Sequence, residues 1–452
     1  MLIALGLRCS MLFVWPQEWK TDPDGYLAHA EQLADGNGFV GPYSGRPTAY
    51  RPIGYPLLLV PGKWLGIPDG DWCGLMNVVA GVITVVLTIR LAARIGCSAP
   101  SALAAGGLIA ADPLLLRYTP MPMTEVISAM LLTAAVCDWT ASRSCLSDAG
   151  GHSNASGGAM RLIRSGILFG LAALVRPIAI IVIALLTAVE VARQLFRVVR
   201  CCRHPARQTA EPSEQVPPSA SLRSPALAAV PALLAMCVLS PWMIRNAIQF
   251  GRLIPATTHG GYTLALGNNS DFYRDVVQRG GGAWDGAGLD AWQRRMLQQA
   301  VDDGVPPGDE PATDDWYYNQ AHEAMTRQPG LFLAACGQRW MRFWSTRPEL
   351  TASVPGVLVT ALRVWYGMLW AGILLGTVPA VRSIIRWYVK PRRMESPYLP
   401  AWLVVVVVAF LLMHTVYWTN ARMRAPLMPI LAVLAVAGYE SVSRLVCGSR
   451  KC

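Results

Sequence analysis

The sequence is poor in charged residues. Asp, Glu, Lys and Arg make up 15% of its 452 residues, whereas soluble globular chains carry about 25%. Apolar residues reach 53%, and they cluster in windows long enough to cross a bilayer. Many basic residues lie in short segments between these windows, where they set membrane topology, so the net charge of +11 does not indicate a nucleic-acid partner. The composition predicts an integral membrane protein in contact with membrane lipids.

Sites built from cysteine, histidine or glycine are also missing. The eleven cysteines show no C-x-x-C pair and no regular spacing, which indicates neither a disulfide framework nor a zinc site. His29, His259 and His414 have no partner at metal-ligand spacing, so we interpret them as structural. The three glycines at 280–282 lack the strand and helix that flank a phosphate-binding loop. No internal repeat is present. These absences leave no predicted metal ligand and no predicted resident cofactor.

The apolar windows predict an all-α multispanning membrane protein with about ten transmembrane helices. Several windows are shorter than the ~20 residues that a crossing usually needs, so this count is accurate to about one or two. The windows lie at 1–15, 73–91, 100–116, 125–140, 163–175, 178–196, 225–242, 364–381, 398–417 and 425–442.

Basic residues predict the orientation of these spans. Arg and Lys follow alternate windows, and placing all of them in the cytoplasm puts the N-terminus inside. The outer segments are then 16–72, 117–124, Arg176-Pro177, 243–363 and 418–424. We therefore expect a transmembrane catalytic module at 1–242, an extracytoplasmic region at 243–363 and C-terminal transmembrane helices at 364–452.

Some segments depart from a simple alternation of spans and loops. The first window carries Arg8 in its middle, so either the chain begins upstream or Arg8 lies near the outer interface; a signal peptide is the rival, although no small-x-small cleavage site follows. Residues 52–68 carry four prolines and a lysine, which favours a helix lying at the interface. Residues 205–225 predict a disordered cytoplasmic linker. Within 313–345, Thr313 is expected to begin a helix.

Two outer loops carry acids close to the predicted bilayer surface. Asp22 and Asp24 follow the first window, where a carboxylate could take a proton from an acceptor group. The alternative is a solvated turn that caps the following helix. Glu125 stands at the start of the fourth window, and carboxylates in spans are costly and tend to be functional. The alternative is an acid favoured by the helix dipole, with Thr124 near the cap position.

Arginines mark the same boundary. Arg51 opens the proline-rich segment, and Arg245 with Asn246 follows the seventh window. A guanidinium group can contact two phosphate oxygens at once, which suits a lipid-phosphate head group. The alternative is snorkelling to lipid phosphates in general. Further arginines in short outer segments run against the charge bias, and an anionic ligand is one reason for them: Arg117, Arg176, Arg422 and Arg424.

Taken in order, these segments resemble the multispanning GT-C glycosyltransferases that use lipid-phosphate sugars. Among them, the chain is most similar to the protein O-mannosyltransferases of glycosyltransferase family 39 and the lipid A aminoarabinose transferase. The resemblance covers nearly the whole length. It is carried by Asp22 to Tyr26 and on to Phe39, Arg51-Pro-Ile-Gly-Tyr-Pro56, Pro113 to Tyr118, Thr124-Glu125, Arg176-Pro177, Pro241-Trp-Met-Ile-Arg-Asn246, Gly267-Asn-Asn269 and Arg422-Met-Arg-Ala-Pro426.

The resemblance implies roles for particular residues. Asp22 matches the family's catalytic acid four residues before Tyr26. Pro23 replaces the usual Glu, and Asp24 is the candidate to compensate for it. Glu125 resembles the second-loop acid. The implied carrier-phosphate ligands are Arg51, Arg245, Arg176, Arg422 and Arg424, and the implied substrate-pocket residues are Tyr26, Tyr55 and Asn246. Relatives differ in metal dependence, so a divalent metal stays open.

The implied activity is transfer of a sugar from a polyprenyl-phosphate carrier to an extracytoplasmic protein, lipid or glycan, with inversion. The implied location is the outer face of a bacterial inner membrane, with undecaprenyl phosphate as carrier. Two alternatives stay open. A transporter or flippase of lipid-linked sugars would need charged or broken helices at the midplane and often inverted repeats, which we do not find. An inactive envelope assembly protein is left open by the departure at Pro23.

Overall fold

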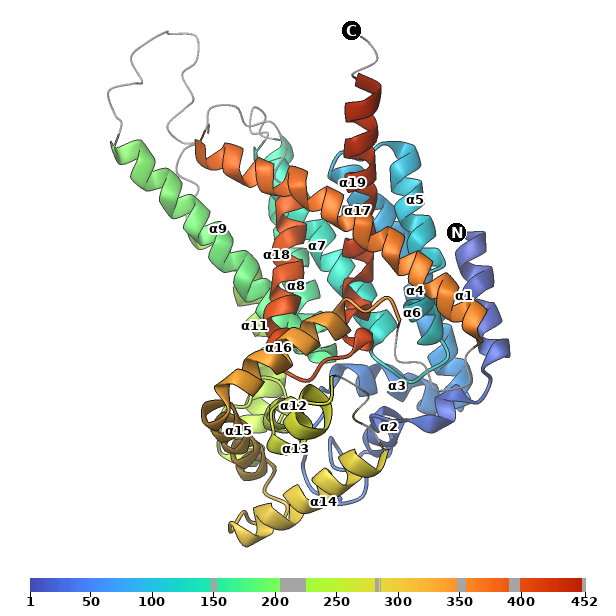
Figure 1. Ribbon diagram of the computed structural model, residues 1–452, viewed down its shortest axis with the longest axis vertical. Coiled ribbons are helices and arrows are strands. Elements are labelled where there is room, and N and C mark those ends of the chain that lie inside the picture. Colours follow the sequence, from blue (N-terminus) through green and yellow to red (C-terminus); the bar gives the residue numbers. More distant parts are fainter. Residues whose placement is uncertain are drawn as a thin grey trace.

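The computed structural model describes residues 1–147, 153–203, 225–280, 284, 286–347, 355–389 and 399–448. Within these ranges the chain is helical, and its only β pairing is an isolated bridge between Val40 and Pro47. Long helices form a bundle, and short helices gather at the end of the bundle opposite the C-terminus, the lower end in Figure 1. The predicted all-α class is confirmed.

The bundle contains helices of very different length. Its members are α1 (Leu2–Val14), α4 (Asp69–Arg94), α5 (Ala99–Ala110), α6 (Pro113–Arg117), α7 (Glu125–Ser147), α8 (Ser153–Val175), α9 (Ile178–Arg203), α11 (Pro225–Phe250), α17 (Gly356–Val389), α18 (Leu399–Val416) and α19 (Met428–Gly448). In the described ranges, seven helical segments are long and apolar enough to cross a membrane: Asp69–Arg94, Ala99–Arg117, Ser156–Val175, Ile178–Phe196, Leu227–Phe250, Gly356–Thr377 and Ala421–Arg444.

The predicted count of ten spans is therefore not confirmed, although a helix occupies each of the ten windows. The first and ninth windows form shorter apolar helices, Leu2–Val14 and Ala401–Val416. The fourth window forms α7, which buries polar side chains such as Thr133 and Thr140. Because α7 packs inside the bundle, its sequence can be less apolar than that of a lipid-facing span.

Arg8 has a structural role that the sequence did not reveal. Its buried guanidinium group donates to the backbone carbonyls of Ile109 and Leu115, at 3.4 and 3.5 Å, and to Thr119 Oγ1 at 3.2 Å. These acceptors lie around the break between α5 and α6, where Pro113 prevents a continuous helix. Pro113 has no N–H to donate to the Ile109 carbonyl, so Arg8 supplies a donor there, while the Leu115 carbonyl also accepts from Thr119 Oγ1 at 3.0 Å.

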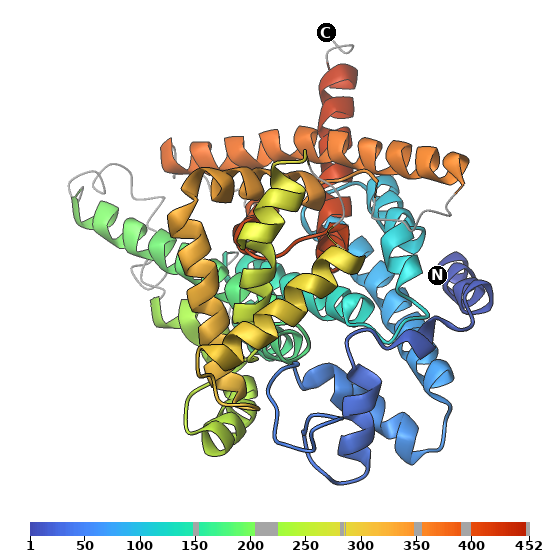
Figure 2. The same cartoon turned by 60° about the horizontal axis from the view of Figure 1, so that its bottom comes forward.

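The lower end of the bundle is built from short helices. They are η1 (Glu18–Thr21), α2 (Tyr26–Ala34), α3 (Gly54–Trp64), α12 (Gly260–Gly267), α13 (Ser270–Phe272), η4 (Tyr273–Val277), α14 (Gly286–Asp302), α15 (Glu310–Arg327), α16 (Pro329–Phe343) and η5 (Ala421–Leu427). Figure 2 shows the segment that holds α2 and α3 beside the group formed by α12 to α16. The proline-rich segment 52–68 forms α3, which at 11 residues is too short to span a bilayer.

One predicted boundary at this end is wrong. Helix α15 begins at Glu310 instead of Thr313, because Asp309 accepts a hydrogen bond from the Ala312 N–H at 2.9 Å and so caps the helix. Helix α15 buries Trp316, Tyr317 and Ala321. The predicted linker at 205–225 lies outside the described residues except for Pro225, which begins α11, and Gly281 and Gly282 lie outside them as well.

Helices α17 and α19 cross at glycines. A Cβ atom on Gly438 would lie 2.1 Å from the Gly372 carbonyl oxygen, and one on Gly376 would lie 2.2 Å from that of Leu434. Small residues at such crossings let membrane helices approach closely. We expect Gly376→Leu to force the helices apart and to destabilise the protein by about 1–3 kcal/mol or more. Gly367→Leu is the control, because its Cβ would meet nothing within 4 Å. Equal thermal unfolding of the two variants in detergent would contradict this.

Candidate functional site

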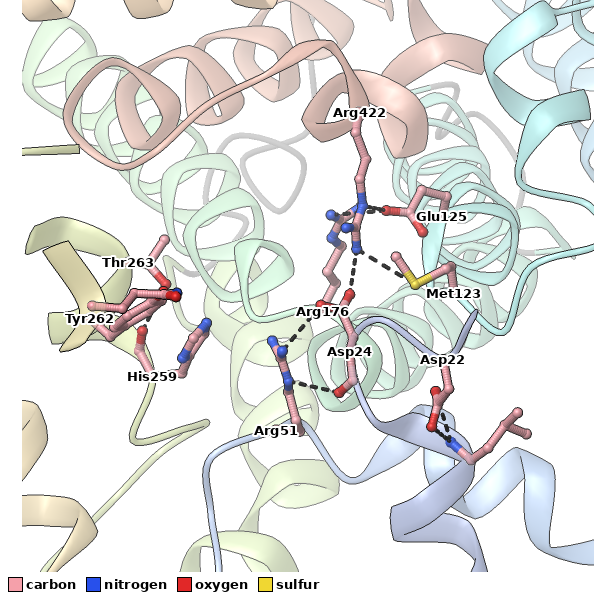
Figure 3. Close-up of polar contacts among 12 residues, drawn as sticks. Asp22, Asp24, Arg51, Met123, Glu125, Arg176, His259, Tyr262, Thr263 and Arg422 are labelled. Carbon is pink, nitrogen blue, oxygen red and sulfur yellow. Dashed lines mark hydrogen bonds and ion pairs between the residues drawn. The ribbon is translucent and has the colours of Figure 1, made fainter. Parts of the chain in front are cut away.

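Five charged side chains from separate segments meet at the lower end of the bundle. We call Asp24, Arg51, Glu125, Arg176 and Arg422 the ion cluster. Asp24 and Arg51 come from the first loop, before α2 and before α3 respectively, and the other three come from the start of α7, the α8–α9 turn and η5. Figure 3 shows the Arg422 guanidinium group between the Glu125 and Asp24 carboxylates, with Arg176 beside it and Arg51 on the other side of Asp24. Residues nearly 400 positions apart in the sequence therefore contribute to one site.

Asp24 is held by two arginines. Arg51 donates to the Asp24 carbonyl at 3.0 Å and to its Oδ1 at 3.1 Å, and Arg422 donates to Oδ2 at 2.6 Å. Burial raises the pKa of Asp24, but the positive charges of Arg422 and Arg51 outweigh this effect and leave the pKa below its ordinary value. Asp24 is therefore a carboxylate in this arrangement, and its charge orients both guanidinium groups.

Glu125 lies deeper in the site and has no exposed side-chain surface. Its Oε1 accepts from Arg422 and lies 3.4 Å from Arg176. Its Oε2 is buried and has no hydrogen-bond partner among the described residues, and the same holds for Nη1 of Arg176. A buried donor or acceptor without a partner is costly. The ion cluster thus has unused hydrogen-bonding capacity that a ligand could satisfy.

The charges of the ion cluster do not cancel. Three guanidinium groups face two carboxylates, which leaves one positive charge in excess. The arginine side chains are 16–22% exposed, so the site is mostly shielded from water but still open to a ligand. Guanidinium groups bind phosphate oxygens in pairs, and partial burial strengthens such contacts. The arrangement suits a monoanionic or dianionic phosphate.

Asp22 lies beside the ion cluster and belongs to the turn that leads into α2. Its carboxylate accepts from the backbone N–H groups of Leu27 and Ala28 at 3.1–3.2 Å, so it caps the helix. Figure 3 shows Asp22 pointing away from Arg51, Arg176 and Arg422. The turn has Asp22 at φ 27° and Gly25 at φ 72°. Gly25 adopts this left-handed backbone without strain, and the chain reverses so that Asp24 reaches the arginines.

Burial raises the pKa of Asp22, an effect that outweighs the hydrogen bonds from the backbone N–H groups of Leu27 and Ala28. The two acids of the first loop therefore differ. Asp24 is paired with guanidinium groups and has a lowered pKa, whereas Asp22, among the described residues, accepts hydrogen bonds from backbone donors only and has a raised pKa. Of the two, Asp22 is the stronger base.

The structure places several other predicted site residues outside the ion cluster. Arg245 donates to the carbonyls of Thr48 and Phe39, at 2.7 and 2.6 Å, and so braces the loop before Arg51. Asn246 accepts from Arg245 and donates to the Ile254 carbonyl.

Arg424 and the two predicted pocket tyrosines also have other partners. Arg424 is fully buried and donates to the carbonyls of Phe343 and Ser345. The Tyr55 hydroxyl contacts Cys73 Sγ at 3.5 Å. Tyr26 packs edge-on against Tyr55 and lies 6.0 Å from the Arg51 guanidinium, which places it beside the ion cluster.

Sequence reasoning missed the aromatic side of the site. The Arg51 guanidinium lies 5.2 Å from the Tyr50 ring, which packs against His259 at 4.3 Å, and His259 stacks on Tyr262 at 5.1 Å. Burial, with a smaller effect from Arg51, lowers the pKa of His259 to about 3, so this ring is neutral. The adjacency of Tyr50 to Arg51 was the one available signal, because nothing in the sequence links 259–262 to the first loop.

A cavity of about 340 Å³ adjoins this aromatic group. We call it the tyrosine cavity. It is lined by Tyr50, Thr258, Tyr262, Gln293, Leu297, Gly308, Glu310, Thr313, Asp314 and Tyr317. They come from the first loop, the segment before α12, and helices α12, α14 and α15. Tyr50 lines the cavity and also contacts Arg51, so the tyrosine cavity and the ion cluster are neighbours.

In the described ranges, no three His, Cys, Asp or Glu side chains lie close enough together to hold a metal ion. The two acids of the ion cluster are both engaged by guanidinium groups. A divalent metal that acts with a bound substrate stays an open prediction.

No protein-family model and no curated protein matches the sequence. Among solved structures, the chain is similar to the oligosaccharyltransferase AglB from Archaeoglobus fulgidus in complex with an inhibitory peptide and a dolichol-phosphate. The identity is 12% and the TM-score 0.49, over 99% of this chain and 51% of that one. It is also similar to ArnT from Cupriavidus metallidurans bound to undecaprenyl phosphate, with 14% identity and a TM-score of 0.38, over 94% and 74% of the two chains. The chain spans about half the length of AglB.

Proposed function

We propose that this chain is a membrane glycosyltransferase that moves a sugar from a polyprenyl-phosphate carrier to an acceptor outside the cytoplasm. The observation that carries the proposal is the ion cluster: three arginines and two acids converge from four segments at one end of an apolar bundle. A lipid-linked phosphate needs both an apolar path for its chain and cations at the lipid boundary. The described helices and the ion cluster offer these two features side by side.

In this proposal Arg51, Arg176 and Arg422 bind the carrier phosphate. As the bond between the anomeric carbon and the phosphate oxygen breaks, negative charge accumulates on the phosphate, and fixed guanidinium groups stabilise that charge. Asp24 and Glu125 hold the arginines in place before the donor arrives. Arg245 supports the same arrangement indirectly, since it braces the loop that leads to Arg51.

Asp22 is proposed as the general base. In an inverting transfer the acceptor attacks the sugar from the face opposite the phosphate. A carboxylate bonded to the phosphate-binding arginines lies on the phosphate side. Asp22 lies outside the ion cluster and accepts from the backbone N–H groups of Leu27 and Ala28. Asp22 takes the acceptor's proton, the acceptor oxygen or nitrogen bonds to the anomeric carbon, and the carrier leaves as its phosphate.

A transfer assay tests the proposal. The purified chain is reconstituted in vesicles with an undecaprenyl-phosphate-linked radiolabelled sugar, and the envelope fraction of a strain lacking the chain supplies the unmodified acceptor. We expect label to move to the envelope fraction with release of undecaprenyl phosphate, and Arg51→Gln to slow this at least about tenfold. Arg279→Gln is the control, because Arg279 is 73% exposed and lies outside the ion cluster. Label that crosses the vesicle membrane while still attached to its carrier would instead indicate a flippase.

A further inference from the structure

The tyrosine cavity has a chemistry opposite to that of the ion cluster. Among the described residues that line it, none is basic, whereas Glu310 and Asp314 bring carboxylates. The lining itself therefore offers a phosphate no cationic partner. The donor's phosphate group belongs at the ion cluster, and the tyrosine cavity is suited to a different part of the reaction.

The walls of the tyrosine cavity are fixed before any ligand binds. Glu310 Oε2 accepts from the Ala49 N–H and from Thr258 Oγ1, both at 2.9 Å, which ties α15 to the first loop. Asp314 Oδ1 accepts from the Gly261 N–H at 2.6 Å. A Cβ atom at position 261 would lie 2.1 Å from the Asp314 carbonyl oxygen, so this close approach requires glycine. A preformed cavity loses little entropy on binding.

The lining combines flat aromatic faces with hydrogen-bonding groups. Tyr50, Tyr262 and Tyr317 supply the rings, and Tyr262 and Tyr317 meet edge to face at 5.4 Å. Gln293 donates to the Tyr262 hydroxyl at 2.6 Å, which orients that hydroxyl to donate its own proton onward. Aromatic faces pack against apolar C–H surface, while carboxylates accept strong hydrogen bonds from hydroxyl groups. A ligand with a C–H face and a rim of hydroxyls meets both demands.

We propose that the tyrosine cavity binds an uncharged sugar ring of the acceptor, so that the acceptor is a glycan. This inference rests on the proposed transfer function, and it names the acceptor class for the same site. The cavity volume of about 340 Å³ is at the small end of ligand pockets, which suits one or two sugar rings. Because Tyr50 borders both the tyrosine cavity and Arg51, a sugar bound there lies next to the donor's phosphate site.

Binding to the full-length protein in nanodiscs tests this without the donor. The probes are chitobiose, maltose and cellobiose as uncharged disaccharides, glucuronic acid as an anionic sugar and a Ser/Thr-containing hexapeptide. Saturation-transfer NMR and calorimetry are expected to show saturable binding of at least one uncharged disaccharide, with a Kd on the order of 1 mM or tighter. Glucuronic acid is expected to bind at least about tenfold more weakly than that disaccharide, because Glu310 and Asp314 repel it.

A matched pair of variants localises the binding. Leu297→Trp adds bulk at the cavity rim on α14 and is expected to weaken disaccharide binding at least about tenfold. Leu297 is 60% exposed, so the larger side chain does not disturb a core. Val301→Trp, one turn along the same helix, is 56% exposed and does not line the cavity, so it should bind as the unmodified chain does.

Three results would overturn the glycan inference. They are that no uncharged disaccharide shows saturable binding, that the Leu297→Trp variant binds the disaccharide as tightly as the unmodified chain, or that the hexapeptide is the one probe that binds. The proposed function is judged separately by undecaprenyl-phosphate release in the transfer assay. Disaccharide binding without release of undecaprenyl phosphate would support the tyrosine cavity as a sugar site and contradict the transferase function. Release of undecaprenyl phosphate without disaccharide binding would support the transferase function and contradict the sugar site.

Discussion

Arg422→Met is expected to slow transfer strongly and to destabilise the protein. Arg422 bridges Asp24 and Glu125, so its loss leaves Glu125 with no exposed surface and only the longer contact to Arg176. Removing one partner of a buried ion pair typically costs about 3–5 kcal/mol. The loss of a cation that stabilises the leaving phosphate should lower kcat by a further factor of about 10²–10³. Transfer rate and denaturant unfolding of the purified protein measure the two effects.

A second substitution separates stability from catalysis. In the double variant Arg422→Met with Glu125→Gln, the buried carboxylate is neutralised, so much of the lost stability should return. Transfer should stay slow, since the cation is still missing. A single Arg422→Met variant that unfolds like the unmodified chain and transfers sugar at the normal rate would show that the ion cluster is neither structural nor catalytic.

Asp22→Asn is expected to reduce transfer by a factor of about 10²–10⁴, the usual contribution of a general base. The fold should be retained, because an asparagine oxygen can still accept from the Leu27 and Ala28 N–H groups that Asp22 now caps. Binding of undecaprenyl phosphate should be unchanged, since Asp22 contacts none of the arginines of the ion cluster in the described structure. A transfer assay and a carrier-binding assay on the same preparation separate these effects.

Two further substitutions serve as comparisons for Asp22→Asn. Asp35→Asn changes an exposed acid at the end of α2 and should be as active as the unmodified chain. Asp24→Asn removes the carboxylate that orients Arg51 and Arg422, so it should weaken carrier binding as well as transfer. Full transfer by Asp22→Asn would remove Asp22 from the mechanism, and would move the role of base to another group.

Much of the architecture was predictable because its signals are local. Apolar windows locate the helices of the bundle, and prolines in 52–68 mark a segment that cannot cross. Prediction of the helices from sequence was less accurate where packing inside the bundle decides which residue types a helix can carry. Helix α7 is buried within the bundle, so its polar side chains lower its apolar signal without preventing its place there. Asp and Thr both suit the cap position of a helix, so the sequence alone did not decide between Asp309 and Thr313. In the structure, Asp309 is the residue whose side chain accepts from a free backbone N–H group.

The site was predictable in kind and less so in detail. Acids and arginines at the loop boundaries indicated an anionic ligand, and Asp24, Arg51, Glu125, Arg176 and Arg422 do come together. Sequence spacing could not separate Arg422 from Arg424, two residues apart in η5. The turns of η5 direct the first toward Glu125 and the second toward the carbonyls of Phe343 and Ser345. The tyrosine cavity depends on contacts between distant segments, which no local pattern records.

The most direct test of the account is a structure of the full-length protein in nanodiscs with undecaprenyl phosphate. We predict that the phosphate lies within hydrogen-bonding distance, about 3 Å, of at least two of Arg51, Arg176 and Arg422, with its chain between the helices of the bundle. A phosphate bound at the opposite end of the bundle, with the ion cluster unchanged and empty of ligand, would contradict the proposed carrier site and the mechanism built on it.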